Sequence, residues 1–494
     1  MAHRNVPDVV IMTMSSETST GAFGAFAPTS QAVGVAPARL VRRRGPVPRW
    51  WRDASVAAGW LVLLVVTALW VRGGGIQDLT SVSDALMSVG RLTGLIASAL
   101  LLIQVFLMAR VPWVEQAWGQ DELARTHRLV GFTSFNLMLG HILLITLGYA
   151  AATSEGIVGT AVDLVLNYPG MLLALAGTAA LVMVVVTSVK RARKRLRYES
   201  WHLIHLYGYL GAGLALPHQL WTGTDFLAST TATVFWWSLY VACAGAVLVF
   251  RVGLPLWRSL GTPLRVLDVR AEGPGVTTVT VGGSGVRRMP VRAGQFFQWR
   301  FLDGPGWSRG NPYSLSAAPD GRTLRFTAAH VGDGSARLAR LEPGTRVLVE
   351  GPYGRMHAGV RARRKVLLMG SGIGITPMRA LLEELDQAPG DVTVVHRVRS
   401  RSDAVLADEI AALAAARGAR YLLIEGPRVP DRDSWLPAQA RHLTDVQALR
   451  EVVPDVADHD VYLCGSDGWM TAARTAAIDA GVPHDAVHLE RFAY

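Results

Sequence analysis

Residues 127–150, HRLVGFTSFNLMLGHILLITLGYA, form the stretch that most limits what this chain can fold into. The stretch is apolar enough and long enough to cross a lipid bilayer as a single helix. It contains His127 and His141, which are fourteen residues apart. On a helix of about 3.6 residues per turn, these two side chains lie on nearly the same face, about 21 Å apart along the axis. An imidazole in a membrane is costly without a partner, so the sequence must supply one elsewhere.

A second stretch, residues 200–220, carries His202, His205 and His218. A lone membrane histidine is most simply a hydrogen-bonded one, but two helices that each offer two imidazoles at similar depths can hold two hemes. A zinc site would instead need carboxylates or thiols close by. His205 and His218 would not share a face on a straight helix, because thirteen steps turn by about 220°. We expect Pro217 to distort the helix and to bring His218 inward.

The cysteine content limits which cofactors the chain can hold. Its 494 residues indicate two to four domains. Only Cys243 and Cys464 are present, which argues against a disulfide framework and excludes a four-cysteine iron–sulfur cluster within this chain. The Cys-x-x-Cys-His motif of covalent c-type heme is absent, so any heme is predicted to be b-type.

Six apolar segments and the charges between them predict the membrane topology. The segments lie at about residues 54–71, 85–108, 127–150, 168–189, 200–218 and 231–252. Basic residues gather on one side only, with the largest groups at residues 42–52, 110–128 and 190–197. The positive-inside rule then predicts a multi-pass cell-membrane protein, in contact with lipid, with both termini in the cytoplasm. This topology explains the net charge of +11 and argues against a nucleic-acid partner, while residues 1–47 are predicted to be a disordered tail.

Arg91 is a charged residue near the outer end of the second apolar segment. Two interpretations stay open for it. Its side chain can snorkel to the membrane interface, or it can balance the charge of heme propionates or of an anionic product.

After residue 260 the pattern changes to short β-like runs separated by Gly and Pro, which predicts a small antiparallel barrel over about residues 262–357. Within it, RGNPYSLSAAP at residues 309–319 places a Tyr–Ser pair on a strand, suited to a flavin ring and its reactive nitrogen. In the following GDGSARL run, Gly332, Gly334 and Ser335 precede an expected helix start and are suited to a pyrophosphate.

Residues 365–494 alternate between strands and helices. A glycine turn at residues 370–374 leads into a helix, an arrangement that lets a backbone approach a phosphate. Arginines at the end of the next strand, without an acidic residue there, favour a 2′-phosphate and so NADPH over NADH. A late strand ends in Cys464–Gly465, and the terminal HLERFAY offers an aromatic side chain to cover a flavin.

Taken together, these motifs resemble those of the ferric reductase and NADPH oxidase superfamily over about residues 50–494. The most specific are the four-histidine spacing, PYSLS, GSGIGITP and YLCG. The resemblance implies a multidomain membrane protein: a six-helix transmembrane bundle, an antiparallel β-barrel FAD domain and an α/β Rossmann-like nucleotide domain. The implied parts are a tail at 1–47, a ferric reductase-like transmembrane domain at 48–260, an FAD-binding domain at 261–357 and an NAD(P)-binding domain at 358–494.

The resemblance also implies site residues. His127 and His205 would bind the iron of an inner heme, and His141 and His218 that of an outer heme, with His202 as the spare histidine. The predicted catalytic residues are Ser314, Cys464, Phe492 and Arg91. The predicted cofactor-binding residues are Asn311, Pro312, Tyr313, Ser314, Gly334, Ser335, Gly370, Gly372, Gly374, Thr376, Pro377, Arg397, Arg399, Ser400, Arg401, Cys464, Gly465 and Phe492. Asn311 departs from the family, in which many oxidases have His at that place, and no EF-hand is present.

The function expected from the resemblance is electron transfer from cytoplasmic NAD(P)H, through FAD and two b-type hemes, to a small-molecule acceptor outside. Ferric or other metal chelates are the first acceptor candidate, and O2, giving superoxide, is the second. An alternative of another class is a membrane transporter or anchor that carries a flavin reductase module, its histidines serving metal or proton transfer. The sequence gives no indication of a protein partner.

Overall fold

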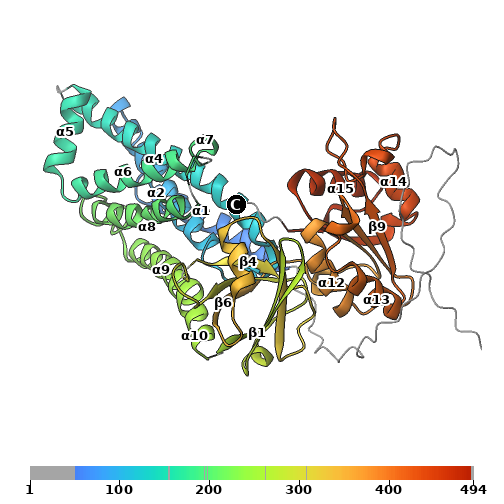
Figure 1. Cartoon of the computed structure of the whole chain (residues 1–494). Coiled ribbons are helices and arrows are strands. Elements are labelled where there is room, and N and C mark those ends of the chain that lie inside the picture. Colours follow the sequence, from blue (N-terminus) through green and yellow to red (C-terminus); the bar gives the residue numbers. More distant parts are fainter. Residues whose placement is uncertain are drawn as a thin grey trace, which may run out of the picture. The chain divides into compact units, whose positions relative to one another are not determined.

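The computed structural model describes residues 50–153, 156–193, 195–196, 198–261, 263–307 and 309–490. They form two compact units, of which the first ends at Gly253 and the second begins at Leu254. Figure 1 shows the elements of both units. The predicted tail at residues 1–47 and the predicted flavin-covering Phe492 lie outside the described residues.

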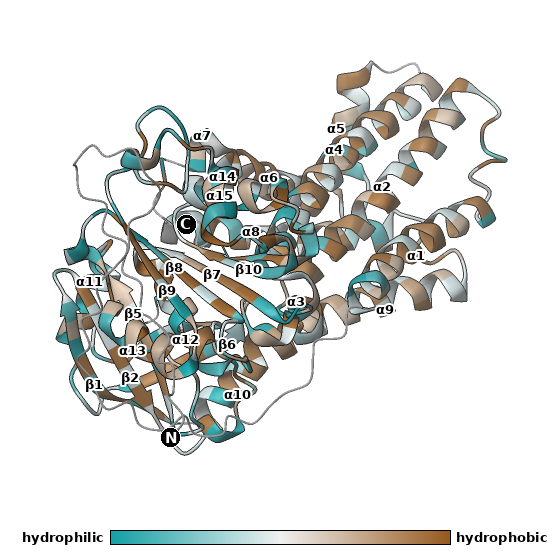
Figure 2. Ribbon diagram, turned by 90° about the vertical axis from the view of Figure 1, so that its right-hand side faces the viewer, coloured by the Kyte–Doolittle hydropathy of each residue, from teal (hydrophilic) through white to brown (hydrophobic). Residues whose placement is uncertain are grey.

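The first unit is helical throughout. Its elements are α1 (Trp50–Arg72), α2 (Val82–Leu107), α3 (Pro112–Trp118), α4 (Gln120–Ala152), α5 (Ile157–Asn167), α6 (Met171–Ser188), α7 (Lys190–Arg193), α8 (Tyr198–Trp221), α9 (Thr230–Ala246) and the π-helix η1 (Val247–Gly253). Many of the long helices have exposed apolar side chains, such as Leu64 and Leu143, and the ribbon in Figure 2 shows that most residues of these helices are hydrophobic. Such exposure is the pattern of helices that face lipid.

Five helices of the described chain are long and apolar enough to cross a membrane: α1, α2, α4, α6 and the span Thr230–Ser259 that begins with α9. They confirm five of the six predicted segments as candidate spans. The sixth predicted segment, at residues 200–218, does form a helix, α8, which contains three histidines and is not among these five candidate spans. Pro217 lies inside α8 and does not end it, because the helix continues to Trp221.

Glycines allow the membrane helices to pack closely in two pairs, α2 with α4 and α6 with α8. A Cβ atom on Gly177 of α6 would lie 2.8 Å from the carbonyl oxygen of Gly211 on α8. A Cβ atom on Gly148 of α4 would lie 2.6 Å from the Met87 side chain of α2. Small residues at such crossings are the usual means by which membrane helices approach one another. The close pairing matters for function, since α4 and α8 carry the four predicted histidine ligands.

The second unit begins with α10 (Leu254–Gly261) and continues into an antiparallel sheet of order β4-β3-β6-β1-β2-β5. Its strands are β1 (Leu264–Gly273), β2 (Val276–Gly282), β3 (Phe296–Phe301), β4 (Asn311–Ser314), β5 (Thr323–Ala329) and β6 (Arg346–Tyr353). One face packs on a buried core that includes Phe297, Trp299 and Phe326. The edge strands approach each other at a bridge between Leu315 and Phe326. The antiparallel sheet is confirmed, and its closure into a barrel stays a prediction.

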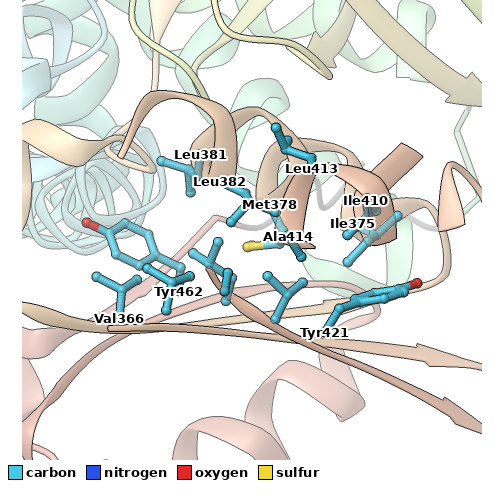
Figure 3. Close-up of a cluster of buried hydrophobic side chains, with 14 of the residues drawn as sticks. Val366, Ile375, Met378, Leu381, Leu382, Ile410, Leu413, Ala414, Tyr421 and Tyr462 are labelled. Atoms are coloured by element: carbon cyan, nitrogen blue, oxygen red, sulfur yellow. The ribbon is translucent and has the colours of Figure 1, made fainter. Parts of the chain in front are cut away.

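A parallel sheet of order β11-β10-β7-β8-β9 follows. Its strands are β7 (Lys365–Ser371), β8 (Val392–Val398), β9 (Arg420–Glu425), β10 (His459–Cys464) and β11 (Val487–Leu489), and its helices are α12 (Ile375–Glu384), α13 (Ala407–Arg417), α14 (Asp445–Val452) and α15 (Asp467–Asp479). Separate apolar cores lie on its two faces. Figure 3 shows the core beneath α12 and α13, where Met378 and Leu381 pack near Tyr421 and Tyr462. Apolar cores on both faces are expected for a parallel sheet covered by helices.

Hydrogen bonds and ion pairs join the two sheets within the second unit. Glu383 of α12 accepts a hydrogen bond from the backbone N–H of Ala318 at 2.7 Å. Glu409 of α13 accepts from Arg325 of β5 at 2.9 Å and pairs with Arg379 of α12 at 2.6 Å. These contacts connect α12, the helix that follows the glycine turn, to Ala318 at the end of the predicted flavin motif and to β5, the next strand in the sequence.

Candidate redox site

His127 and His205 face each other across the first unit. Their ring centroids are 5.9 Å apart, and the ring planes are inclined by 62°. Two imidazoles bound to opposite sides of one metal ion place their ring centroids about 6 Å apart, given a metal–nitrogen bond of about 2 Å. The observed separation therefore fits a shared iron. Because these contacts bring His205, one turn beyond His202, against His127, they favour His205 as the ligand.

Both histidines of α4 are held by backbone carbonyl groups of α2. His127 Nδ1 lies 3.0 Å from the carbonyl oxygen of Gln104, and His141 Nδ1 lies 2.8 Å from that of Gly90. A carbonyl oxygen only accepts hydrogen bonds, so each Nδ1 carries the proton and each Nε2 keeps its lone pair for a metal. Gln104 and Gly90 are fourteen residues apart, as are the two histidines. The sequence motif contained no signal for this match, because it depends on the register between two antiparallel helices.

The second pair, His141 and His218, lies in closely packed surroundings. A Cβ atom on Gly94 of α2 would lie 2.5 Å from His141 Nδ1. A Cβ atom on Gly170, just before α6, would lie 2.8 Å from the backbone nitrogen of His218. Glycine at both positions therefore leaves room for the helix segments that carry these histidines. Within the described residues, the buried Nδ1 of His218 has no well-aligned hydrogen-bond partner.

Side chains that bind metal do not cluster further in the described part of the chain. No group of three or more His, Cys, Asp or Glu residues there forms a metal site. The histidine pairs thus lack the third protein ligand that a catalytic zinc would use. A heme would need only two nitrogen ligands from the protein, a number that a pair of histidines could supply.

Arg91 is held by two carboxylates in this structure. Its guanidinium lies 2.9 Å from Asp78, in the segment before α2, and 3.5 Å from Asp225, in the segment before α9. Burial raises the pKa of Asp225, and the charge of Arg91 acts in the opposite direction. The guanidinium therefore joins three segments at the end of the bundle near His141, and the group as a whole is acidic.

The predicted flavin motif forms β4. Tyr313 stacks on Phe326 with ring centroids 5.0 Å apart and planes inclined by 8°, so one face of Tyr313 is already covered. Burial raises the pKa of the Tyr313 hydroxyl. The Ser314 side chain is buried, and its Oγ has no hydrogen-bond partner among the described residues. Since buried hydroxyl groups are normally paired, Ser314 fits a ligand that supplies the missing partner, as a flavin ring nitrogen would.

The neighbouring GDGS run has a different arrangement from the predicted one. A short helix, α11 (Asp333–Ala336), already begins at Asp333, so Gly334 and Ser335 lie within it. Ser335 Oγ accepts from the N–H groups of Val331 and Gly332 at 2.9 and 3.2 Å, and donates to the Gly332 carbonyl. Ser335 therefore stabilises its own turn, while a Cβ atom on Gly334 would lie 2.9 Å from Asn311 Oδ1.

The glycine near the end of β7, Gly370, and the two in the turn that follows, Gly372 and Gly374, have different reasons for being glycine. Cβ atoms on Gly370 and Gly374 would lie 2.6 Å from Ile375 Cα and 2.3 Å from the Cys464 carbonyl oxygen. Gly372 instead has a φ of +55° and nothing within 4 Å of its Cβ position. Only Gly372 therefore opens onto free space for a ligand, and the other two permit close packing. Thr376 and Pro377 are buried in the first turn of α12, just beyond this loop.

Cys464 ends β10 beside this loop and is buried. Burial, together with the nearby charge of Glu490, raises the pKa of its thiol to about 12, so it stays protonated. A Cβ atom on Gly465 would lie 2.9 Å from the Ser371 side chain, which explains a glycine there. The sequence motifs did not single out Glu490, which lies close to Cys464 and 2.4 Å from the Cβ position of Gly354. The one indication of Glu490 in the sequence was its position in HLERFAY, close to the aromatic residue predicted to cover the flavin.

The predicted arginine cluster is only partly available for a ligand. Arg397 is buried and donates to the carbonyl groups of Val398 and Pro427. Burial lowers its pKa to about 10, and the charges of Arg428 and Arg399 add to this. Arg401 lies 3.9 Å from Glu425 of β9, an acidic neighbour that comes from another strand. Ser400 hydrogen-bonds to Asp403 at 2.9 Å. Arg399 and Arg428 are the exposed cations nearest Arg397.

Comparison with known proteins identifies two family matches. Residues 93–216 match the family described as ferric reductase like transmembrane component. Residues 368–475 match the oxidoreductase NAD-binding domain. The first match includes His127, His141 and His205, and the second includes the glycine turn and Cys464.

Similar individual proteins cover the C-terminal half. Ferredoxin–NADP reductase B of Sorangium cellulosum is 30% identical over 240 residues, which are 46% of this chain and 96% of that protein. An NADPH oxidoreductase of Mycobacterium tuberculosis is 28% identical over 248 residues, 48% of this chain and 62% of that protein. The FAD/NAD-binding domain of a nitric oxide dioxygenase from Vibrio cholerae is 25% identical, covering 47% of this chain and 98% of that domain, with a TM-score of 0.37.

Proposed function

Because this chain belongs to the ferric reductase and NADPH oxidase superfamily, as an NAD(P)H-dependent oxidoreductase with a ferric reductase-like transmembrane component, we propose that it transfers electrons across the cell membrane. The donor is NADPH or NADH, the carriers are FAD and two b-type hemes, and the acceptor is a small molecule on the opposite side. The observation that carries this proposal is the facing pair His127 and His205, whose ring centroids are 5.9 Å apart, on the two helices that also carry His141 and His218.

The chain's own residues bind and orient the cofactors. When bound, FAD accepts a hydride, and hemes carry electrons one at a time. Ser314 places a hydroxyl group at the flavin motif, and this hydroxyl lacks a hydrogen-bond partner among the described residues. Cys464 and Glu490 lie at the ends of the neighbouring strands, where they hold a neutral thiol and a carboxylate for the nicotinamide side. The open loop at Gly372 and the first turn of α12 receive the nucleotide phosphates.

The nucleotide site and both termini lie in the cytoplasm in this proposal. The support is the one-sided distribution of Lys and Arg around the apolar segments. The His127–His205 pair is then the inner heme site, and the His141–His218 pair is the outer one. Along α4 the two sites are about 21 Å apart, a separation that matches the need to move charge across the apolar layer.

Metal chelates are the first acceptor class in this proposal, and O2 is the second. Arg91 is the cation nearest the outer histidines that the sequence singled out, and two carboxylates already neutralise it. An anionic product such as superoxide therefore gains little from this arginine. An acidic outer group disfavours anions, so among metal chelates it favours those without net negative charge.

An anaerobic absorption spectrum of the detergent-purified, full-length protein tests the proposal. Addition of NADPH is expected to bleach the flavin and to produce the reduced bands of a b-type heme. Heme that stays oxidised beside bleached flavin would show that the two halves are not coupled. Protein without heme after heme-replete expression would overturn the proposal and favour a membrane anchor or transporter with a flavin reductase. Metal reduction without oxygen, compared with superoxide yield in air, then separates the two acceptor classes.

A further inference from the structure

The four histidines differ in how their Nδ1 atoms are held. On α4, both Nδ1 atoms have a backbone carbonyl partner at 2.8 and 3.0 Å. On α8, His205 Nδ1 lies 3.3 Å from the Ser188 hydroxyl, and His218 Nδ1 has no aligned partner among the described residues. A carbonyl oxygen at 2.8 to 3.0 Å is a strong acceptor, whereas 3.3 Å is long for a hydrogen bond. The facing pair His127 and His205 thus joins a firmly held imidazole to a weakly held one.

Ser188, the last residue of α6, has a second partner. The indole Nε1–H of Trp201 donates to the same Ser188 oxygen at 3.3 Å. Trp201 lies one turn before His205 on α8, and its ring rests against the imidazole with centroids 4.9 Å apart and planes inclined by 31°. Ser188, Trp201 and His205 therefore all contact one another: the indole packs against the imidazole, and the Ser188 hydroxyl lies within hydrogen-bonding distance of one nitrogen of each ring.

Arg193 of α7 adds a cation to this group. Its guanidinium carbon lies 4.5 Å above the centre of the Trp201 ring. A cation over an indole face is attracted to it and draws electron density from the ring, which makes the N–H a better donor. The serine oxygen has two lone pairs and can accept from both the indole N–H and His205 Nδ1–H. Because the Ser188 oxygen is shared between two donors, it is a weaker acceptor for His205 than the Gln104 carbonyl oxygen is for His127.

We propose that Ser188, Trp201 and Arg193 are positioning residues that aim His205 at His127 and make it the weaker electron donor of the inner pair. The inference rests on the proposed heme binding and specifies how this chain tunes it. A stronger acceptor at Nδ1 makes a metal-bound imidazole more basic, and the groups around the axial ligands set the reduction potential of a heme. Loss of the Ser188 hydroxyl therefore removes the remaining acceptor of His205 and shifts the potential of that heme upward.

The test uses full-length, heme-loaded protein in lipid nanodiscs, with electron paramagnetic resonance spectra and a redox titration. Ser188→Ala is expected to change the low-spin signal of one heme and to make its midpoint potential more positive, leaving the other heme unchanged. Ser188→Thr keeps a hydroxyl and is expected to restore both properties. Thr187→Val is the matched control, because Thr187 Oγ1 bonds only to carbonyl groups of its own helix, Met183 at 2.8 Å and Val184 at 3.1 Å.

Trp201→Phe provides a second, independent variant, since it keeps an aromatic face against His205 and removes only the indole N–H. It is expected to change the signal of the same heme, by less than Ser188→Ala does. Unchanged spectra and potentials in both Ser188→Ala and Trp201→Phe would overturn the inference while leaving heme binding intact. Wild-type protein that binds no heme would instead overturn the proposed function and, with it, this inference.

Discussion

Gly94→Ala is the substitution for which the structure makes the sharpest prediction. Gly94 lies on α2 where His141 of α4 crosses it. A Cβ atom there would lie 2.5 Å from His141 Nδ1 and 2.9 Å from its Cγ and Cε1 atoms. The Gly90 carbonyl that holds His141 Nδ1 is one turn away on the same helix. The added methyl group therefore meets the ring edge that makes this hydrogen bond.

The size of the effect follows from these distances. Ordinary van der Waals contact begins at 3.4 Å, so the imidazole has to retreat by about 0.9 Å, the difference from 2.5 Å. A retreat of that size lengthens the 2.8 Å bond to Gly90 beyond hydrogen-bonding distance. Overpacking typically costs about 1–3 kcal/mol, and loss of the partner of a metal-bound histidine typically lowers metal affinity by about 10- to 100-fold. We expect the outer heme to be lost and the inner heme to stay.

The assay is heme content relative to flavin, measured on purified protein by the pyridine hemochrome spectrum. Wild type is expected to hold two hemes per flavin, and Gly94→Ala one. Gly140→Ala is the matched control, since Gly140 precedes His141 on α4 and nothing lies within 4 Å of its Cβ position. Alanine there also favours the helix by about 1 kcal/mol. Two hemes with wild-type spectra in Gly94→Ala would refute the assignment of His141.

Four further predictions concern other parts of the molecule. His205→Ala is expected to abolish binding of the inner heme, whereas His202→Ala is expected to retain it, as heme content and optical spectra will show. Ser314→Ala is expected to slow flavin reduction by NADPH about 100-fold in stopped-flow measurements, since it removes a hydrogen bond at the reacting ring. Arg399→Glu is expected to raise the KM for NADPH about tenfold or more, equivalent to about 1.4 kcal/mol, with little change for NADH. Glu409→Gln is expected to lower the free energy of unfolding of the reductase unit by about 2 kcal/mol at neutral pH, and a series of FAD-release temperatures between pH 3 and pH 8 will show how this difference depends on pH.

The sign of the Glu409 prediction follows from its pKa. Burial raises the pKa of Glu409, but the charges of Arg379 and Arg325 outweigh burial and bring it below the ordinary 4.5. A carboxylate with a lowered pKa stabilises the folded state above its unfolded pKa, and this stabilisation is lost as the pH falls through the folded value. The difference between wild type and Glu409→Gln is therefore expected to shrink below about pH 4.5. A constant difference across that range would contradict the ion-pair explanation.

Controls separate these effects from general damage. Ser316→Ala removes a buried hydroxyl that accepts from Thr327 at 2.9 Å, two residues beyond Ser314. It is expected to lower stability without slowing flavin reduction, and an equal loss of rate in both serine variants would exclude a specific role for Ser314. Equal loss of NADH and NADPH activity in Arg399→Glu would exclude 2′-phosphate recognition. Loss of heme in both histidine variants would contradict the choice of His205.

Local patterns in the sequence predicted much of this molecule. Apolar length is a property of a single segment, so it predicted five candidate membrane helices without knowledge of packing. Histidine spacing, another such property, led to the prediction of iron ligands, which stays a prediction. The strand–glycine–helix pattern predicted β7, the turn at residues 372–374 and α12. These features can be recognised in a sequence because backbone geometry alone relates residue spacing to direction in space.

Contacts between segments could not be predicted in this way. That Gly370 and Gly374 serve packing while Gly372 opens onto free space depends on where β10 and Ile375 lie. That Arg397 is buried, and that Arg401 faces Glu425, depends on the neighbouring strand β9. That two carboxylates hold Arg91 depends on the segments before α2 and α9, which carry Asp78 and Asp225. From its own segment alone, each of these arginines was predicted to interact with a ligand or with the membrane interface.

The sequence by itself thus determined which chemical groups this protein has and how deep along each helix they lie. Tertiary structure alone decided which nitrogen of His127 and of His141 is free, since that choice is made by Gln104 and Gly90 on another helix. It also decided which of two neighbouring histidines faces His127. The physical reason is that spacing along a helix sets depth and direction, whereas hydrogen-bond partners and close contacts depend on the register between helices, which no single segment encodes.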